Sequence, residues 1–228
     1  LLLSASSLGA VVTDSRVLKP NYIVEYTKTP GEISEISDFF SESMVYGRLR
    51  SNSFWYEYDK NNALFQDHFK SGIGGSVTIK TPFYGGFGAT AGFYGTLPLG
   101  DDNNYDNLPL NYTKTAKDLF RTRSDGTEAP IGVLAVGYIE YKTPTNDLTI
   151  GRQIFDNALF FFFYGKMIPN TFEAALLKNS YFDKTILQLG YITAQKLRDH
   201  MEFHSIIAYE RLEENDDASA HKGLSVEN

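Results

Sequence analysis

The sequence predicts an all-β protein, an antiparallel transmembrane β-barrel of which about seven or eight strands are present. Three observations favour this class: several segments alternate polar and apolar residues, aromatic residues make up 14% of the chain, and short turns alternate with long connections. Successive side chains of a strand point to opposite faces, so alternation with a period of two separates a wet face from an apolar face.

The segment 44–59 shows the pattern most clearly. Arg48 and Arg50 share one face with Tyr46, whereas Leu49 lies on the other face among small and apolar residues. The segment is longer than a usual soluble strand of about five or six residues, and it ends in an aromatic cluster. A long strand with a cationic face and aromatic residues at one end is typical of a transmembrane barrel.

The alternation returns further along the chain. We expect strands over 73–80, 85–96, 131–142, 148–155, 172–179 and 185–193, and an eighth strand that opens at 205–209. Tight turns are expected near Pro82, Pro144 and Asp183, and longer connections over 60–70, 97–130 and 156–170. Outer-membrane barrels have short turns on one side and long loops on the other. This asymmetry favours a barrel over the main alternative, a soluble or surface-attached β-sandwich that binds a ligand.

The expected strand 131–142 is less regular than the others. One face carries Val133 and Ile139, and the opposite face carries Glu140. Leu134 and Val136 fall on the same face as Glu140, so that face is not consistently polar.

Composition and the N-terminus limit the class of protein further. A net charge of −7 and a pI near 5.1 argue against a general nucleic-acid binder, which is usually basic. Residues 1–10 resemble the remnant of a secretory signal peptide, with small residues before a cleavage site after Ala10. We expect residues 11–43 to be an N-terminal leader and residues 44–228 to be the N-terminal part of a porin barrel.

The sequence offers no group that indicates catalysis, a cofactor or a metal site. The chain has no cysteine, so thiol chemistry is absent. His200 and His204 have a spacing that could hold zinc on a helix, but no HExxH motif accompanies them, which favours a solvated or hydrogen-bonded pair. The glycines of segment 86–91 match a dinucleotide fingerprint by letters only, because they lie inside an expected strand. A barrel enzyme of the outer membrane is therefore the third hypothesis.

Five stretches together resemble an OprD-like outer-membrane porin of a Gram-negative bacterium, in their order and spacing. They are segments 44–58, 72–95, 137–153, 166–174 and 195–204. The resemblance implies an eighteen-stranded barrel whose third loop folds inward to narrow the pore. It also implies inner-wall arginines that guide anionic or zwitterionic solutes such as amino acids. The chain would be the N-terminal portion of such a protein.

Carried over by position, segment 156–170 would be the constriction loop. Its run of Phe160, Phe161, Phe162 and Phe163 is more apolar than a water-lined constriction should be. The expected function is a water-filled channel for small polar solutes that bear carboxylates or resemble amino acids. The expected partners are outer-membrane lipid and these solutes, without nucleic acid, and a homo-oligomer is compatible with this function.

The two faces of the expected strands give two sets of residues. Residues expected to line the pore are polar or charged: Arg48, Arg50, Thr78, Lys80, Glu140, Lys166 and Glu173. Residues expected to face lipid are aliphatic: Leu49, Val77, Ile79, Val133, Ile139, Leu187 and Leu189. The arginines would attract carboxylates, whereas Glu140 and Glu173 would contact the ammonium ends of the solutes.

Overall fold

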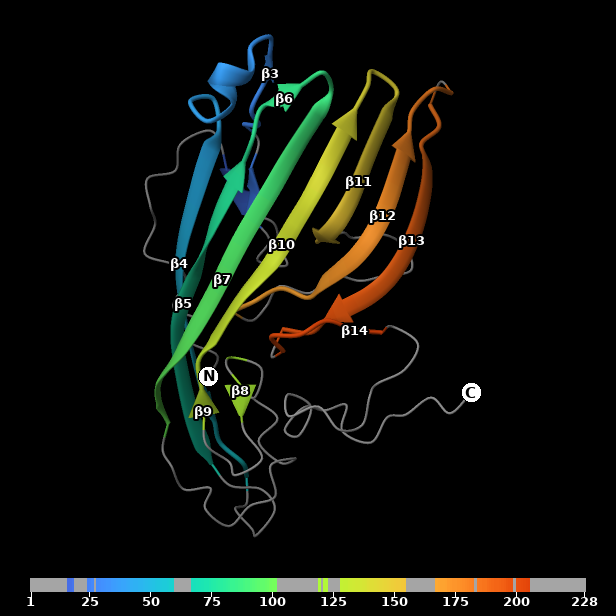
Figure 1. The fold of residues 1–228 in the computed structure, drawn as a ribbon. Coiled ribbons are helices and arrows are strands. Elements are labelled where there is room, and N and C mark those ends of the chain that lie inside the picture. The colour runs from blue at the N-terminus through green and yellow to red at the C-terminus, as the bar shows by residue number, and fades with distance from the viewer. Residues whose placement is uncertain are drawn as a thin grey trace.

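The computed structural model describes most of the expected strands. The described residues are 16–18, 24–26, 28–59, 67–101, 119, 121–122, 128–154, 167–182, 184–198 and 200–205. Most of them belong to one large, open sheet whose long strands run side by side (Figure 1). Among these residues, no helix is long and apolar enough to cross a membrane.

Eight strands follow one another across this sheet. Their bounds are β4 (Met44–Tyr56), β5 (His68–Lys80), β7 (Phe87–Asp101), β10 (Ile131–Lys142), β11 (Asn146–Gln153), β12 (Thr171–Asn179), β13 (Leu187–Lys196) and β14 (His204–Ser205). Each strand is antiparallel to the next one on this path. This arrangement confirms the all-β antiparallel class and the expected number of strands. The β-sandwich alternative is wrong, because these strands form one sheet rather than two facing sheets.

Short turns join the strands at one end of the sheet (Figure 1). At the first turn, the two-residue strand β6 (Phe83–Tyr84) leads into β7 through Gly85 and Gly86, which have φ values of 57° and 84°. Positive φ at both central residues is the geometry of a type I′ hairpin, which glycine adopts without strain. Backbone hydrogen bonds connect neighbouring turns, because Lys142 N–H donates to the Gly86 carbonyl over 2.8 Å.

Two strands extend further than the alternation predicts. β5 begins at His68 rather than Ile73, and β7 continues to Asp101, so the long connection expected from residue 97 starts later. β7 contains Pro98, which lies opposite Gly72 beside a bulge in β7 itself, where Leu99 is the inserted residue. Proline cannot donate a hydrogen bond to a ladder, and a bulge or a sheet edge tolerates it. The connection also contains two short strands, β8 (Arg121–Thr122) and β9 (Glu128–Ala129).

A bulge in β10 corrects the face assigned to Val133. The register of β10 on β7 shifts between Leu134 and Val136, which inserts one residue into the strand. Val133 pairs with the buried Tyr94 and is itself buried, whereas Ile139 beyond the bulge is exposed on the opposite face. Val133 is therefore not a lipid-facing residue. The same bulge explains why the alternation over 131–142 looks irregular in the sequence.

The leader contacts the inner face of the sheet, the face that carries Tyr46 and Arg48. β1 (Arg16–Leu18) and β2 (Val24–Tyr26) form a hairpin. β3 (Glu32–Ile33) pairs in parallel with β6, and a short 3-10 helix, η1 (Ile36–Phe39), precedes β4. The ring of Tyr26 lies 4.0 Å from the ring of Tyr46. Residues 1–10, the expected remnant of a signal peptide, lie outside the described residues.

Candidate permeation face

The inner face of β4 carries the two arginines expected in the pore. Arg48 lies opposite Ser76 and Arg50 lies opposite Gly74 on β5. The side chain of Arg50 is only 8% exposed, and that of Arg48 is half-buried. Alternation of side chains places both arginines on the same face as Tyr46. The structure thus brings two cations to one face, two residues apart on a single strand.

Charges of both signs occupy this face nearer the short turns. Thr78 lies opposite Tyr46 on β4, and the next inward residue of the same strand is Lys80. Glu140 on β10 has Lys80, Lys142 and Asp147 as its charged neighbours. Asp147 is not among the pore residues expected from the sequence, because only the pairing of β11 with β10 brings it close to Glu140.

An apolar cluster covers another part of the inner face. Ile131, Val133 and Val136 of β10 are buried together with Met167 and Ile168, which immediately precede β12. Ile168 is 0% exposed and Met167 is 2% exposed. The chain therefore returns to the wall across the inner face, where the resemblance places the end of the constriction loop. Lys166 and the four phenylalanines 160–163 lie outside the described residues.

Glu173 does not lie with the other pore residues expected from the sequence. It lies opposite Arg152 of β11, which in turn lies opposite Gly137 of β10. Tyr138, the neighbour of Gly137, lies on the same inner face as Glu140, so Gly137 belongs to the opposite, outer face. Its partners across the sheet, Arg152 and Glu173, therefore project to the outer face. Glu173 and Glu140 therefore lie on opposite faces of the sheet. The face of Glu173 could not be predicted from the sequence, because segment 171–179 lacks a period of two.

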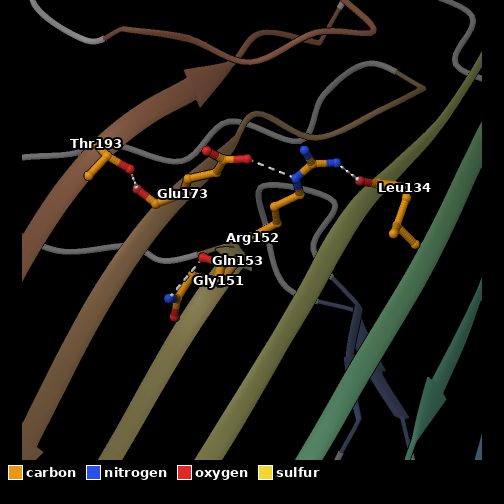
Figure 2. A network of polar contacts seen from close by, with 6 residues as sticks. All are labelled: Leu134, Gly151, Arg152, Gln153, Glu173 and Thr193. Atoms are coloured by element: carbon orange, nitrogen blue, oxygen red, sulfur yellow. Dashed lines mark hydrogen bonds and ion pairs between the residues drawn. The ribbon is translucent and has the colours of Figure 1, made fainter.

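A polar network surrounds these two residues (Figure 2). The Nε atom of Arg152 donates a hydrogen bond to Oε1 of Glu173 over 2.9 Å, and these groups form an ion pair. The Nη1 atom of Arg152 donates to the carbonyl of Leu134 over 3.4 Å. Thr193 on β13 donates from its hydroxyl to the carbonyl of Glu173 over 3.1 Å. The network therefore joins four strands, from β10 to β13.

The outer face is apolar and exposed. Six of the seven residues expected to face lipid lie there, with exposed fractions between 44% and 83%: Leu49, Val77, Ile79, Ile139, Leu187 and Leu189. Further aromatic and aliphatic residues on this face are also exposed, among them Trp55, Phe93 and Ile150. An apolar surface of this extent on a water-soluble protein would be unusual.

The two histidines form a buried pair rather than a solvated one. Nδ1 of His200 and Nε2 of His204 share a hydrogen bond of 2.8 Å, and the rings meet edge to face. The segment between them is not helical. Within the described ranges, no group of three or more histidine or acidic side chains is arranged to hold a metal ion.

Comparison with known proteins gives a match of folds. No family model and no curated protein matches the chain. OccAB3 of Acinetobacter baumannii superposes with a TM-score of 0.61 and 15% identity, over 72% of this chain and 40% of that one. OccK9 (OpdG) of Pseudomonas aeruginosa has a TM-score of 0.54 and 17% identity, over 71% and 40%. OpdK, an outer-membrane protein of P. aeruginosa, has a TM-score of 0.50 and 17% identity, over 73% and 39%.

These solved structures are OprD-family porins. The chain has the fold of part of an OprD-family porin wall. The resemblance seen in the sequence is thereby confirmed at the level of the fold. The chain spans less than half the length of the porins that it matches. These porins are not enzymes, so the comparison supports neither the barrel enzyme nor any catalytic role.

Proposed function

We propose that this chain forms part of the wall of an outer-membrane porin in a Gram-negative bacterium. The observation that carries the proposal is the opposite character of the two faces of one continuous sheet. Leu49 is 83% exposed on the outer face, while the adjacent Arg48 and Arg50 project to the inner face. The apolar outer face suits contact with lipid, and the charged inner face suits a water-filled channel.

The antiparallel sheet suits a membrane only as part of a closed barrel. Hydrocarbon cannot satisfy backbone N–H and C=O groups, so a spanning sheet must have no open edge. In the proposed porin, the outer edges of β4 and β14 pair with further strands. Outer-membrane lipid is then the partner of the apolar face, and the proposal concerns the full-length protein.

The charges of the inner face favour solutes that carry a carboxylate. Arginine binds carboxylates through two parallel N–H donors, and Arg48 and Arg50 offer two guanidinium groups on one strand. Glu140 and Asp147 supply negative charge nearer the short turns, where an ammonium group would be favoured. OpdK, one of the porins with a similar fold, was crystallised with vanillate, an aromatic carboxylate. Carboxylate-bearing or amino-acid-like solutes are therefore the proposed substrates.

Segment 156–170 is the proposed constriction. Its last part supports this role, because Met167 and Ile168 pack on the inner face of β10 instead of extending the wall. A segment that crosses the inner face narrows the path that solutes must take. Charged side chains of the wall then act on permeant ions at short range.

Conductance of the full-length protein in planar lipid bilayers tests the proposal. We expect stepwise channel openings, together with a band whose gel mobility changes on heating, as folded barrels show. Vanillate should reduce the current at lower concentration than vanillyl alcohol, which lacks the carboxylate. A folded protein without conductance would contradict the channel function. Equal block by the two compounds would contradict the proposed class of solute.

A further inference from the structure

The leader is held against the inner face of the sheet at two separate points. Beside β4, the carbonyl of Lys28 accepts a hydrogen bond from the hydroxyl of Tyr46, and the ring centroid of Tyr26 lies 4.0 Å from that of Tyr46. At the end with the short turns, the amide of Phe83 donates to the carbonyl of Gly31 over 2.9 Å, and β3 pairs in parallel with β6 (Figure 1). The chain between these two points therefore follows the inner face.

The residues between the two attachments differ in exposure. Pro30 is buried, whereas Lys28 and Thr29 are exposed. The wall fixes the backbone of Lys28 through its carbonyl, while its side chain is accessible to solvent. A lysine carries its charge on a flexible four-carbon stem, so an exposed lysine with a fixed backbone can move its ammonium group toward a ligand. The leader thus presents a cation on the face that the proposed channel encloses.

Lys28 is attached within a row of cations on the inner face. Tyr46, which holds its carbonyl, precedes Arg48 by two residues, and two residues correspond to about 7 Å along a strand. On the other side of Tyr46, the sulfur of Met44 lies 3.3 Å from the Tyr46 hydroxyl oxygen, and Met44 pairs with Lys80 of β5. The attachment of Lys28 therefore lies between an arginine and a lysine of the same face.

The leader adds a second layer of polypeptide to this part of the wall. β1 and β2 form a two-stranded sheet of their own, and Tyr26 of β2 packs on the inward ring of Tyr46. The hairpin thus lies in front of the wall instead of continuing it. Such a layer reduces the width that is available to a solute. Charged side chains in a narrow water-filled path act on permeant ions at short range.

We infer that Lys28 is a specificity-determining residue, positioned by Tyr46, that receives the carboxylate of a solute between the arginines of β4 and the short turns. The inference rests on the proposed porin function and names a further contact for the same class of solute. Arg48 and Arg50 belong to the wall itself, whereas Lys28 belongs to the leader and has its place only through the attachment to Tyr46.

Single-channel recording of the full-length protein tests this role, with vanillate as the probe. In Lys28→Gln, the concentration of vanillate that halves the current should rise roughly two- to fivefold, the range expected for the loss of one exposed ion pair. Block by vanillyl alcohol, which lacks the carboxylate, should be unchanged. Lys184→Gln is the matched control, because Lys184 is an exposed lysine in the turn between β12 and β13, at the same end of the sheet. Its half-blocking concentration should equal that of the unmodified protein.

A double substitution tests whether Lys28 acts through its attachment to the wall. Tyr46→Phe keeps the ring beside Tyr26 but loses the hydrogen bond to the carbonyl of Lys28. In the Tyr46→Phe background, Lys28→Gln should therefore have a smaller effect on the half-blocking concentration than in the unmodified protein. A double-mutant cycle of this kind isolates the coupling between the two residues.

The outcomes separate the inference from the proposed function. If Lys28→Gln is blocked at the same concentration as Lys184→Gln, the inference is overturned, while channels that vanillate still blocks leave the porin function intact. An equal effect of Lys28→Gln with and without Tyr46→Phe would also overturn it, because Lys28 would then not act from its place on the wall. Lys28→Glu should weaken the block further than Lys28→Gln, and an equal or stronger block would contradict a direct contact with the carboxylate. Absence of channels in the unmodified protein would overturn the proposed function itself.

Discussion

The hydroxyl of Tyr46 on β4 donates a hydrogen bond to the backbone carbonyl of Lys28 in the leader. Together with the stacking of Tyr26 on Tyr46, this bond attaches the leader to the inner face of the wall. Tyr26 and Lys28 therefore occupy part of the space that the proposed channel encloses. The leader is thus a part of the inner surface as well as an approach to the first long strand.

Tyr46→Phe should loosen the leader without unfolding the sheet. The substitution removes the bond to Lys28 but keeps the ring that stacks on Tyr26, so the expected loss is about 0.5–1.5 kcal/mol. Hydrogen exchange of the amides in segment 24–30 of the folded protein measures this loss. Tyr141→Phe removes a hydroxyl from the outer face and serves as the control. Equal protection of the leader in both variants would show that the bond to Lys28 does not hold it.

Ile168→Ala should weaken the attachment of residues 167–170 to the inner face. Ile168 is fully buried against β10, and truncation of a buried isoleucine typically costs about 2–5 kcal/mol. We expect faster proteolysis within 154–170 in the folded, detergent-solubilised protein. Ile36→Ala is the control, since that side chain is 69% exposed and its loss should change stability by less than about 0.5 kcal/mol. Unchanged proteolysis in Ile168→Ala would argue against this packing as the anchor.

The sequence was sufficient for the faces of regular strands. Along β4 and β5 the alternation around Arg48 and Val77 is strict, so the period of two assigns each side chain correctly. Val133 was misplaced because β10 is apolar on both sides of its bulge, and one inserted residue reverses every assignment beyond it. No local pattern marks an insertion in an apolar run.

Other features depend on contacts between distant parts of the chain. Glu173 could be assigned a face only through its pairing with Arg152, because the apolar run that follows it carries no polar alternation. The burial of Ile168 against β10 and the docking of Tyr26 on Tyr46 join segments separated by loops. Neither contact leaves a local signature in composition or period.

The two opposite faces of the β10–β11 hairpin should differ in their tolerance of a charged side chain. Ile139→Arg places a cation on the outer face, where the cost is about 2–4 kcal/mol near the bilayer midplane and less toward its surface. Thr149→Arg, on the inner face directly opposite Glu140, should be tolerated because the new cation meets a carboxylate. The yield of heat-modifiable, full-length barrel in lipid vesicles compares the two variants. Equal yields would contradict the assignment of the outer face to lipid.

Arg48 and Arg50 should set the ion preference of the channel. Replacing both with glutamine keeps polar side chains while removing two positive charges from one inner strand. Because wall charges act on permeant ions at short range, the reversal potential in a salt gradient should shift toward cations. Block by vanillate should weaken in the same double variant, since its carboxylate loses two guanidinium partners.

Arg152→Gln is the control for that experiment, because it removes an arginine from the outer face of the same wall. Its open-state reversal potential should match that of the unmodified protein. The comparison thus tests position rather than the presence of charge alone. An unchanged reversal potential in Arg48→Gln with Arg50→Gln, in a protein that still folds and conducts, would mean that these arginines do not face the permeant ions. The carboxylate preference would then need another source, and the cations nearer the short turns, Lys80 and Lys142, would be the next to replace.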